Sequence, residues 1–125
     1  MLLDTSVIVR VLSGDDKAKA ERAVRFLKTK PTQFTDVSFA ETVWVFVKVY
    51  GYERKRVSEV LKKFIQEPKI SCNRPIIEKT LELYSAKNIK FIDCYLAAVS
   101  LATDGQILSY DLDFNKIAGL KRVEP

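Results

Sequence analysis

The chain opens with Met1-Leu2-Leu3-Asp4-Thr5-Ser6-Val7-Ile8-Val9: an apolar run, one acid, and a second apolar run after two hydroxyl residues. The first run predicts a short buried strand at residues 1–3. The second run continues to Leu12 and predicts a brief apolar helix that ends near Gly14. Asp4 is left at the junction of strand and helix, and in a parallel sheet such junctions lie at the edge where ligands bind.

Two more acids occupy comparable positions later in the chain. A predicted helix starts at Ile92 or Asp93, and Asp111 comes just after a predicted strand at residues 107–110. The ends of parallel strands and the starts of the helices that follow them meet at one edge of a sheet. We therefore expect both acids to lie at the same edge as Asp4.

The fourth acid is Glu41, which we place in the first turn of a helix that begins after Ser38. The spacing Ser-x-x-Glu is that of a capping box, in which the two side chains satisfy each other's backbone N–H groups. This spacing leaves an alternative open, in which Glu41 serves only the end of its helix.

The rest of the chain alternates between helix and strand. Apolar periodicity and breaker residues predict, in chain order, a helix capped by Asp15 or Asp16, a strand at 33–35, a helix at 54–66, a strand at 69–72, a helix at 75–86, an end near Gly105 for the helix that carries Asp93, and an edge strand at 121–123. Such alternation favours an α/β fold with right-handed crossovers. We predict one domain over residues 1–125, a three-layer α/β/α fold with a parallel sheet of four to five short strands and helices on both faces.

Four carboxylates at one edge of a sheet predict a metal site. Two carboxylates about 5 Å apart repel by roughly 3 kcal/mol at an effective dielectric near 20. A cation relieves this repulsion. The chain contains no His, and oxygen ligands without imidazole or thiolate favour Mg²⁺ or Mn²⁺ over Zn²⁺.

The charge balance points to a phosphate-bearing substrate. Lys and Arg outnumber Asp and Glu by 21 to 16, a net charge of +5, although four acids are already assigned to one cluster. Basic segments at 28–30, 54–56, 62–63 and 87–90 can neutralise phosphates around an acidic centre. The alternative is that these lysines and arginines only keep helix faces solvated.

The remaining composition predicts a soluble cytoplasmic protein. Cys72 and Cys94 have no CxxC spacing, so we expect free thiols in a reducing compartment. The start of the chain lacks the charged and apolar regions of a leader, and the apolar run Val43–Val47 is too short to span a bilayer. We expect no membrane partner.

Taken together, these motifs resemble the PIN-domain family of metal-dependent nucleases, and in particular its short VapC-like toxin members. The resemblance spans nearly the whole chain. It is carried by Leu3-Asp4-Thr5-Ser6, Ser38-Phe39-Ala40-Glu41, Phe91-Ile92-Asp93-Cys94-Tyr95-Leu96-Ala97-Ala98 and Leu108-Ser109-Tyr110-Asp111-Leu112-Asp113-Phe114.

This resemblance implies a role for each matching residue. The metal-coordinating acids would be Asp4, Glu41, Asp93 and Asp111. Ser6 and Ser109 would be small hydroxyl residues that support the site, and Asp113 is a near neighbour that competes with Asp111 for the fourth position. The bound Mg²⁺ or Mn²⁺ would activate water for attack on an RNA phosphodiester, as metal sites commonly do.

The family also implies partners, namely an RNA substrate, a small cognate antitoxin and a second copy of the chain. Residues 43–50 are apolar nearly all round at helical spacing, which indicates either core packing or a surface shared with a partner. If the surface is shared, Trp44 or Phe46, with Tyr50 and Tyr52, would line a groove for a neighbouring subunit or an inhibitory peptide helix. Two other functions stay open: an RNA-processing nuclease without an antitoxin, and a catalytically silent RNA-binding or assembly module.

Overall fold

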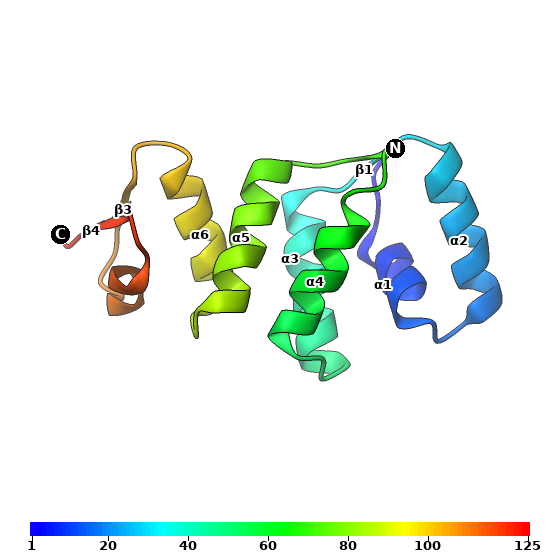
Figure 1. Cartoon of the computed structure of the whole chain (residues 1–125), viewed down its shortest axis with the longest axis horizontal. Helices are drawn as coiled ribbons and strands as arrows, with labels where there is room; N and C mark the ends of the chain where they lie inside the picture. The colour runs from blue at the N-terminus through cyan, green and yellow to red at the C-terminus, as the bar shows by residue number, and fades with distance from the viewer. The chain divides into compact units, whose positions relative to one another are not determined.

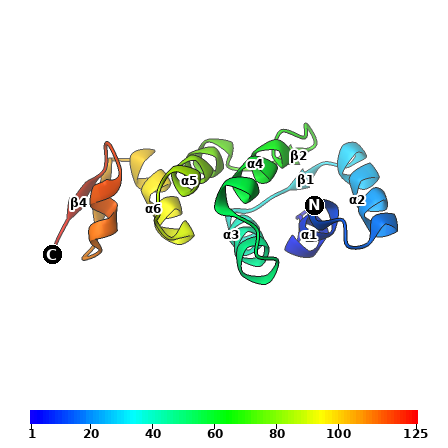
Figure 2. The ribbon, with the colours of Figure 1, turned by 60° about the horizontal axis from the view of Figure 1, so that its bottom comes forward.

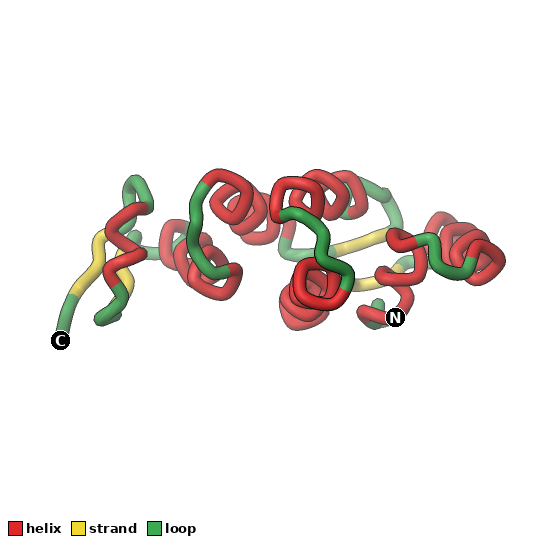
Figure 3. Tube along the Cα trace, turned by 90° about the horizontal axis from the view of Figure 1, so that it is seen from below, coloured by secondary structure: helices red, strands yellow, loops and turns green.

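The computed structural model describes all of residues 1–125. The chain divides into two compact units, Met1–Arg74 and Pro75–Pro125, which we call unit 1 and unit 2. Helices make up most of each unit, and the strands are short (Figure 3). None of the helices combines the length and the apolar character that crossing a membrane requires.

Unit 1 is built from helices around a small sheet (Figure 1). Its elements are α1 (Thr5–Ser13), α2 (Lys17–Thr29), β1 (Thr32–Gln33), α3 (Asp36–Trp44), the π-helix η1 (Val45–Val49), α4 (Arg54–Phe64) and β2 (Ile70–Ser71). The predicted helix end at Gly14 is confirmed, because Gly14 closes α1 with the left-handed φ of 71° that glycine adopts without strain. Asp16 caps α2, as predicted, by accepting from the Lys19 backbone N at 3.0 Å.

Three parallel segments form the sheet of unit 1. β1 pairs with β2 in the register Thr32 to Ile70 and Gln33 to Ser71, and the two strands lie side by side in Figure 2. On its other edge β1 meets residues 1–3, because the Gln33 N donates to the Met1 O and the Leu3 N donates to the Gln33 O, both at 2.8 Å. The predicted first strand thus pairs through a single bridge, and Asp4 follows at its carboxyl end.

The core of unit 1 centres on Phe34, which is 1% exposed directly after β1. Its ring makes edge-to-face contacts with Phe39 of α3 and Phe64 of α4, with a centroid distance of 5.9 Å in each pair. Helix α1 packs against α2 and α3. Truncating a ring packed in this way typically costs about 3–5 kcal/mol, so Phe34 is a principal anchor that holds α3 and α4 on the sheet.

Unit 2 contains two longer helices and a parallel strand pair. Its elements are α5 (Arg74–Ala86), α6 (Phe91–Leu101), β3 (Gln106–Leu108), the 3-10 helix η2 (Leu112–Lys116) and β4 (Lys121–Val123). β3 pairs with β4 in the register Gln106 to Lys121 through Leu108 to Val123. Tyr84 of α5 packs edge-to-face on Phe91 of α6 at 5.3 Å, which joins the two helices.

The predicted α/β class and the parallel pairing are confirmed. The strands are only two or three residues long and lie in two sheets, one in each unit, whereas we expected one sheet of four to five strands. Local sequence limits the pairing, since Pro31, which has no N–H to donate, directly precedes β1.

One helix boundary was predicted wrongly. α3 begins at Asp36, and its N-cap is Thr35 rather than Ser38. The Thr35 hydroxyl accepts from the Ser38 backbone N at 3.2 Å, so Ser38 already lies inside the first turn. Glu41 is consequently in the second turn of α3 and not in the first.

The apolar segment at 43–50 is partly buried and partly exposed. Phe46 is 3% exposed, and its ring packs against Tyr50 and Tyr52 at centroid distances of 5.7 and 5.6 Å, so it belongs to the core. Trp44, in contrast, is 57% exposed at the end of α3. Core packing therefore accounts for Phe46, whereas Trp44 and Val49 face solvent.

Candidate functional site

Asp4 is held by the start of the helix that it caps. The Ser6 backbone N donates to Asp4 Oδ2 at 3.0 Å, and the Ser6 hydroxyl donates to the same oxygen. The Ser6 hydroxyl, followed by the Ser6 backbone N–H, keeps the pKa of the Asp4 carboxyl below its usual 3.8. Ser6 thus holds Asp4 through two hydrogen bonds, and Asp4 is a carboxylate at neutral pH.

Glu41 lies on α3, whose first turn is tied to the start of α1. The Thr5 hydroxyl donates to the Ser38 backbone O at 3.3 Å, three residues before Glu41. The Glu41 side chain is exposed. The capping-box alternative does not hold, because the Thr35 hydroxyl, not Glu41, satisfies the helix end. Helix capping therefore provides no reason for an acid at position 41.

Asp93 lies in the first turn of α6, as predicted, but in an environment opposite to that of Asp4. No side chain caps α6, and Asp93 is only partly buried. Burial is the first cause that raises the pKa of the Asp93 carboxyl, and the Asp111 carboxylate is the second. Lys90 opposes the shift and Asp113 adds to it. Asp111 and Asp113 therefore both disfavour the charged form of Asp93, and Lys90 opposes them.

Asp111 and Asp113 lie on a turn and a 3-10 helix, not on a strand. β3 ends at Leu108, and Asp111 caps η2 by accepting from the Asp113 backbone N at 2.8 Å. The chain therefore turns between the end of β3 and Asp111. Lys116 pairs with Asp113 at 2.8 Å, whereas Asp111 has the stronger effect on the pKa of Asp93. These contacts favour Asp111 as the fourth acid.

Ser109 supports the turn as well. Its hydroxyl accepts from the Asp111 backbone N at 2.9 Å. Its backbone N donates to the Val123 O of β4, also at 2.9 Å. Each serine predicted to support the site is thus hydrogen-bonded to the acid two residues away from it.

Each unit holds part of the predicted acidic set: Asp4 and Glu41 are in unit 1, and Asp93, Asp111 and Asp113 are in unit 2. No three His, Cys, Asp or Glu side chains form a group that could hold a metal ion. The donors are nevertheless all carboxylates, which suit Mg²⁺ or Mn²⁺. The raised pKa of Asp93, to which Asp111 and Asp113 contribute, fits the binding of a cation.

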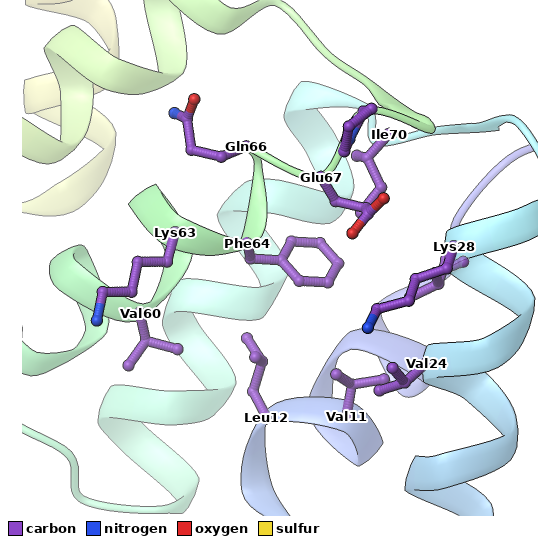
Figure 4. A pocket seen from close by; sticks show the side chains of 12 residues that line it. Val11, Leu12, Val24, Lys28, Val60, Lys63, Phe64, Gln66, Glu67 and Ile70 are labelled. Carbon is purple, nitrogen blue, oxygen red and sulfur yellow. The ribbon is translucent and has the colours of Figure 1, made fainter.

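The sequence did not reveal an apolar groove within unit 1, between α1, α2 and α4 (Figure 4). It has a volume of about 510 Å³, and it is lined by Val11, Leu12, Val24 and Val60 together with the charged side chains Lys28, Lys63 and Glu67. A smaller pocket of about 170 Å³ shares Leu12 and Val60 with the groove and is also lined by Phe46 and Tyr52. The helical periodicity of α1, α2 and α4 was visible in the sequence, but the way in which the three helices leave a gap was not.

Comparisons with known proteins agree with the predicted resemblance. The PIN domain family model matches residues 1–120, and thus residues of both units. A VapC ribonuclease of Aquifex aeolicus (strain VF5) is 28% identical over 132 residues, which cover 99% of this chain and 96% of that protein. The crystal structure of VapBC2 from Rickettsia felis, bound to a DNA fragment from their promoter, matches at 15% identity with a TM-score of 0.39, covering 98% of this chain and 96% of that one. The predicted resemblance is confirmed by the family match: this chain belongs to the PIN-domain family.

Proposed function

We propose that this protein is a metal-dependent endoribonuclease and that it is the toxin of a toxin–antitoxin pair. The name of the Aquifex aeolicus relative, a VapC ribonuclease, supports the activity. The observation that carries the proposal is the cluster in unit 2, where burial and Asp111 raise the pKa of Asp93. An acid that is destabilised by neighbouring acids is suited to binding a cation. We propose further that residues 1–125 work as one PIN domain, which the match to residues 1–120 supports.

In this proposal Asp4, Glu41, Asp93 and Asp111 hold Mg²⁺ or Mn²⁺. A bound divalent ion lowers the pKa of water and offsets the charge of a scissile phosphate. Ser6 orients Asp4 through two bonds to one oxygen, and a carboxylate retains further lone pairs for a cation. Ser109 orients the backbone of Asp111. The net charge of +5 supports attraction of an RNA backbone to the protein.

The test is cleavage of an end-labelled structured RNA by purified protein in Mn²⁺ or Mg²⁺, compared with the same reaction in EDTA. We expect cleavage that depends on metal and that Asp93→Asn abolishes. Glu82→Gln is the matched control, because it also neutralises one acid of unit 2, an exposed one that pairs only with Lys79. Cleavage by Asp93→Asn at the wild-type rate, or cleavage that persists in EDTA, contradicts the proposal and favours the silent RNA-binding module.

We propose that the antitoxin binds the groove of unit 1 through an amphipathic helix with acidic flanks. The floor of the groove is apolar, so it suits the apolar face of a helix. Lys28 and Lys63 at its edge outnumber Glu67, so the rim complements acidic residues. The smaller pocket beside it, lined by Phe46 and Tyr52, suits one projecting side chain of the same helix.

The partner is tested with the small protein encoded beside this chain, by titration calorimetry. Lys28→Glu combined with Lys63→Glu reverses two exposed charges on the rim, and we expect at least about tenfold weaker binding. Lys17→Glu combined with Lys19→Glu makes the same charge change on exposed residues that do not line the groove. Equal weakening by both double variants contradicts the groove assignment, and no binding at all favours the RNA-processing nuclease without an antitoxin.

We propose that the homodimer forms through the exposed apolar side chains of α3 and η1. Val37 is 78%, Trp44 57% and Val49 65% exposed, and Val37 and Trp44 share a helix face because they are seven residues apart. Light scattering after size exclusion should give a dimer for the wild type and a monomer for Trp44→Glu. A dimer in both proteins contradicts this assignment.

A further inference from the structure

Arg122 of β4 makes a set of contacts that its position in an edge strand does not explain. Only 12% of its side chain is exposed. Its Nη1 donates to the Ser109 backbone O at 2.7 Å, and its Nε donates to Asn115 Oδ1 at 3.3 Å. Glu124 Oε2 accepts from Nη1 and Nη2 at 3.1 and 3.2 Å and balances the guanidinium charge.

These contacts lie on both sides of the turn that carries Asp111. Ser109 precedes the turn, and Asn115 lies within η2 after it. The same Ser109 accepts from the Asp111 backbone N through its hydroxyl and donates its own N–H to Val123 of β4. Arg122 therefore connects β4 to both ends of the segment that places Asp111 beside Asp93.

The geometry requires an arginine. One planar guanidinium reaches a carbonyl, an amide oxygen and a carboxylate at the same time, whereas a lysine ammonium is a single point charge on a flexible stem. The ion pair with Glu124 has little weight of its own, because the Glu124 side chain is 59% exposed. The short bond from the guanidinium to the Ser109 O, made by a largely buried charged donor, is the stronger contact.

We infer that Arg122 is a positioning residue for the nuclease site: it holds the 109–115 segment so that the Asp111 carboxylate stays close to Asp93. The inference rests on the proposed nuclease function. Arg122 touches neither Asp111 nor Asp93 directly and acts through Ser109 and Asn115. It differs in this from a cation that binds the RNA backbone.

The first test is steady-state cleavage of a labelled RNA in Mn²⁺. We expect Arg122→Gln to lower kcat by about tenfold to a hundredfold, the equivalent of one charged hydrogen bond, and to leave KM within about twofold. Arg122→Lys should recover only part of kcat, because lysine restores the positive charge but not the planar guanidinium that reaches several acceptors at once. Lys79→Gln, which removes one exposed positive charge of unit 2, is the control and should match the wild type.

Two kinetic outcomes overturn the inference. Wild-type kcat in Arg122→Gln shows that the turn does not need Arg122. A raised KM with unchanged kcat, restored in Arg122→Lys, shows that the residue binds phosphate instead.

The second test does not depend on activity, so it separates this inference from the proposed function. Hydrogen exchange followed by NMR on the metal-free protein should show the Asp111 and Asp113 amides exchanging at least about tenfold faster in Arg122→Gln, with the amides of α5 and α6 unchanged. Unchanged exchange at Asp111 overturns the inference, and faster exchange throughout unit 2 assigns Arg122 a purely structural role. Absence of cleavage by the wild type refutes the nuclease function, while the exchange result still decides whether Arg122 positions the turn.

Discussion

Asp4 of unit 1 and Asp93 of unit 2 are both acids at the start of a helix. Their surroundings, however, shift the pKa of the two carboxyls in opposite directions. Asp4 caps α1 and accepts two bonds from Ser6, which keep the pKa of its carboxyl low. Asp93 has no such donors, and burial together with Asp111 raises the pKa of its carboxyl. A helix N-terminus favours an acid in both cases, but in α6 the loss of solvent and the repulsion from neighbouring acids outweigh that effect.

This difference indicates which acid has a structural reason to be present. Asp4 stabilises its own helix, so a structural role alone accounts for an Asp at position 4. Burial and the Asp111 carboxylate raise the pKa of Asp93, so no structural role of this kind accounts for an Asp at position 93. Unit 2 therefore provides the stronger evidence for a metal site, and the following predictions separate the structural and functional contributions of the two acids.

The largest expected effect is on catalysis. Asp4→Asn and Asp111→Asn should each lower the cleavage rate on the order of a thousandfold, because each removes a charged ligand of the proposed metal site. Asp113→Asn should lower it by about tenfold or less, since Asp113 already pairs with Lys116. Rates with labelled RNA in Mn²⁺ measure this. If Asp113→Asn is the more damaging variant of the two in η2, the fourth acid has been assigned wrongly.

The next effect is on stability in metal. Ligand binding to the folded state adds about 2.7 kcal/mol at a hundred times the dissociation constant. Melting curves in EDTA and in Mn²⁺ should show this gain for the wild type and little or none for Asp4→Asn and Asp93→Asn. Glu82→Gln should behave as the wild type does. Equal Mn²⁺ stabilisation in all four proteins means that the ion binds elsewhere.

A smaller effect on the melting temperature distinguishes the helix-capping role of Asp4 from the role of its charge. Asp4→Ala removes the acceptor for the Ser6 N–H, and we expect a melting temperature about 4 °C lower in EDTA. Asp4→Asn keeps a capping oxygen and should melt close to the wild type, although both variants lose activity. If the Ala variant and the wild type melt at similar temperatures, the bond between Asp4 and the Ser6 N–H does not stabilise the protein.

The smallest effect is on the way in which the stability of the metal-free protein changes with pH. Asp4 and Asp93 should change it in opposite directions. The pKa of Asp93 is raised in the folded state, so its contribution is fully present below its unfolded value near 3.8 and is lost as pH rises through the folded pKa. The pKa of Asp4 is lowered, so its contribution is present above 3.8 and is lost as pH falls through the folded pKa. In EDTA, Asp93→Asn should therefore melt about 2 °C above the wild type at pH 7, with the gap closing below pH 4. A gap that is constant with pH contradicts the raised pKa.

The parts of the fold that depend on neighbouring residues in the sequence could be predicted from it. Gly14 ends α1 and Asp16 caps α2 because a glycine or a short acid acts on backbone groups within a few residues. The boundary of α3 was missed because Thr35 and Ser38 are both good capping residues, and packing of Phe34 and Phe39 selects the earlier one. The turn at Asp111 was missed because its contacts include the bond from Arg122 to the Ser109 O, and Arg122 lies eleven residues after Asp111.

The sequence by itself determined the family and the alternation of helices and parallel strands. These features follow from local periodicity and from the order of short motifs along the chain. Only the tertiary structure decided that Asp4 is a satisfied cap, that Asp93 is partly buried in the field of Asp111, and that α1, α2 and α4 leave a groove. The pKa of a carboxyl and the shape of a groove depend on which distant residues exclude water from a position, and spacing along the chain does not specify those distances.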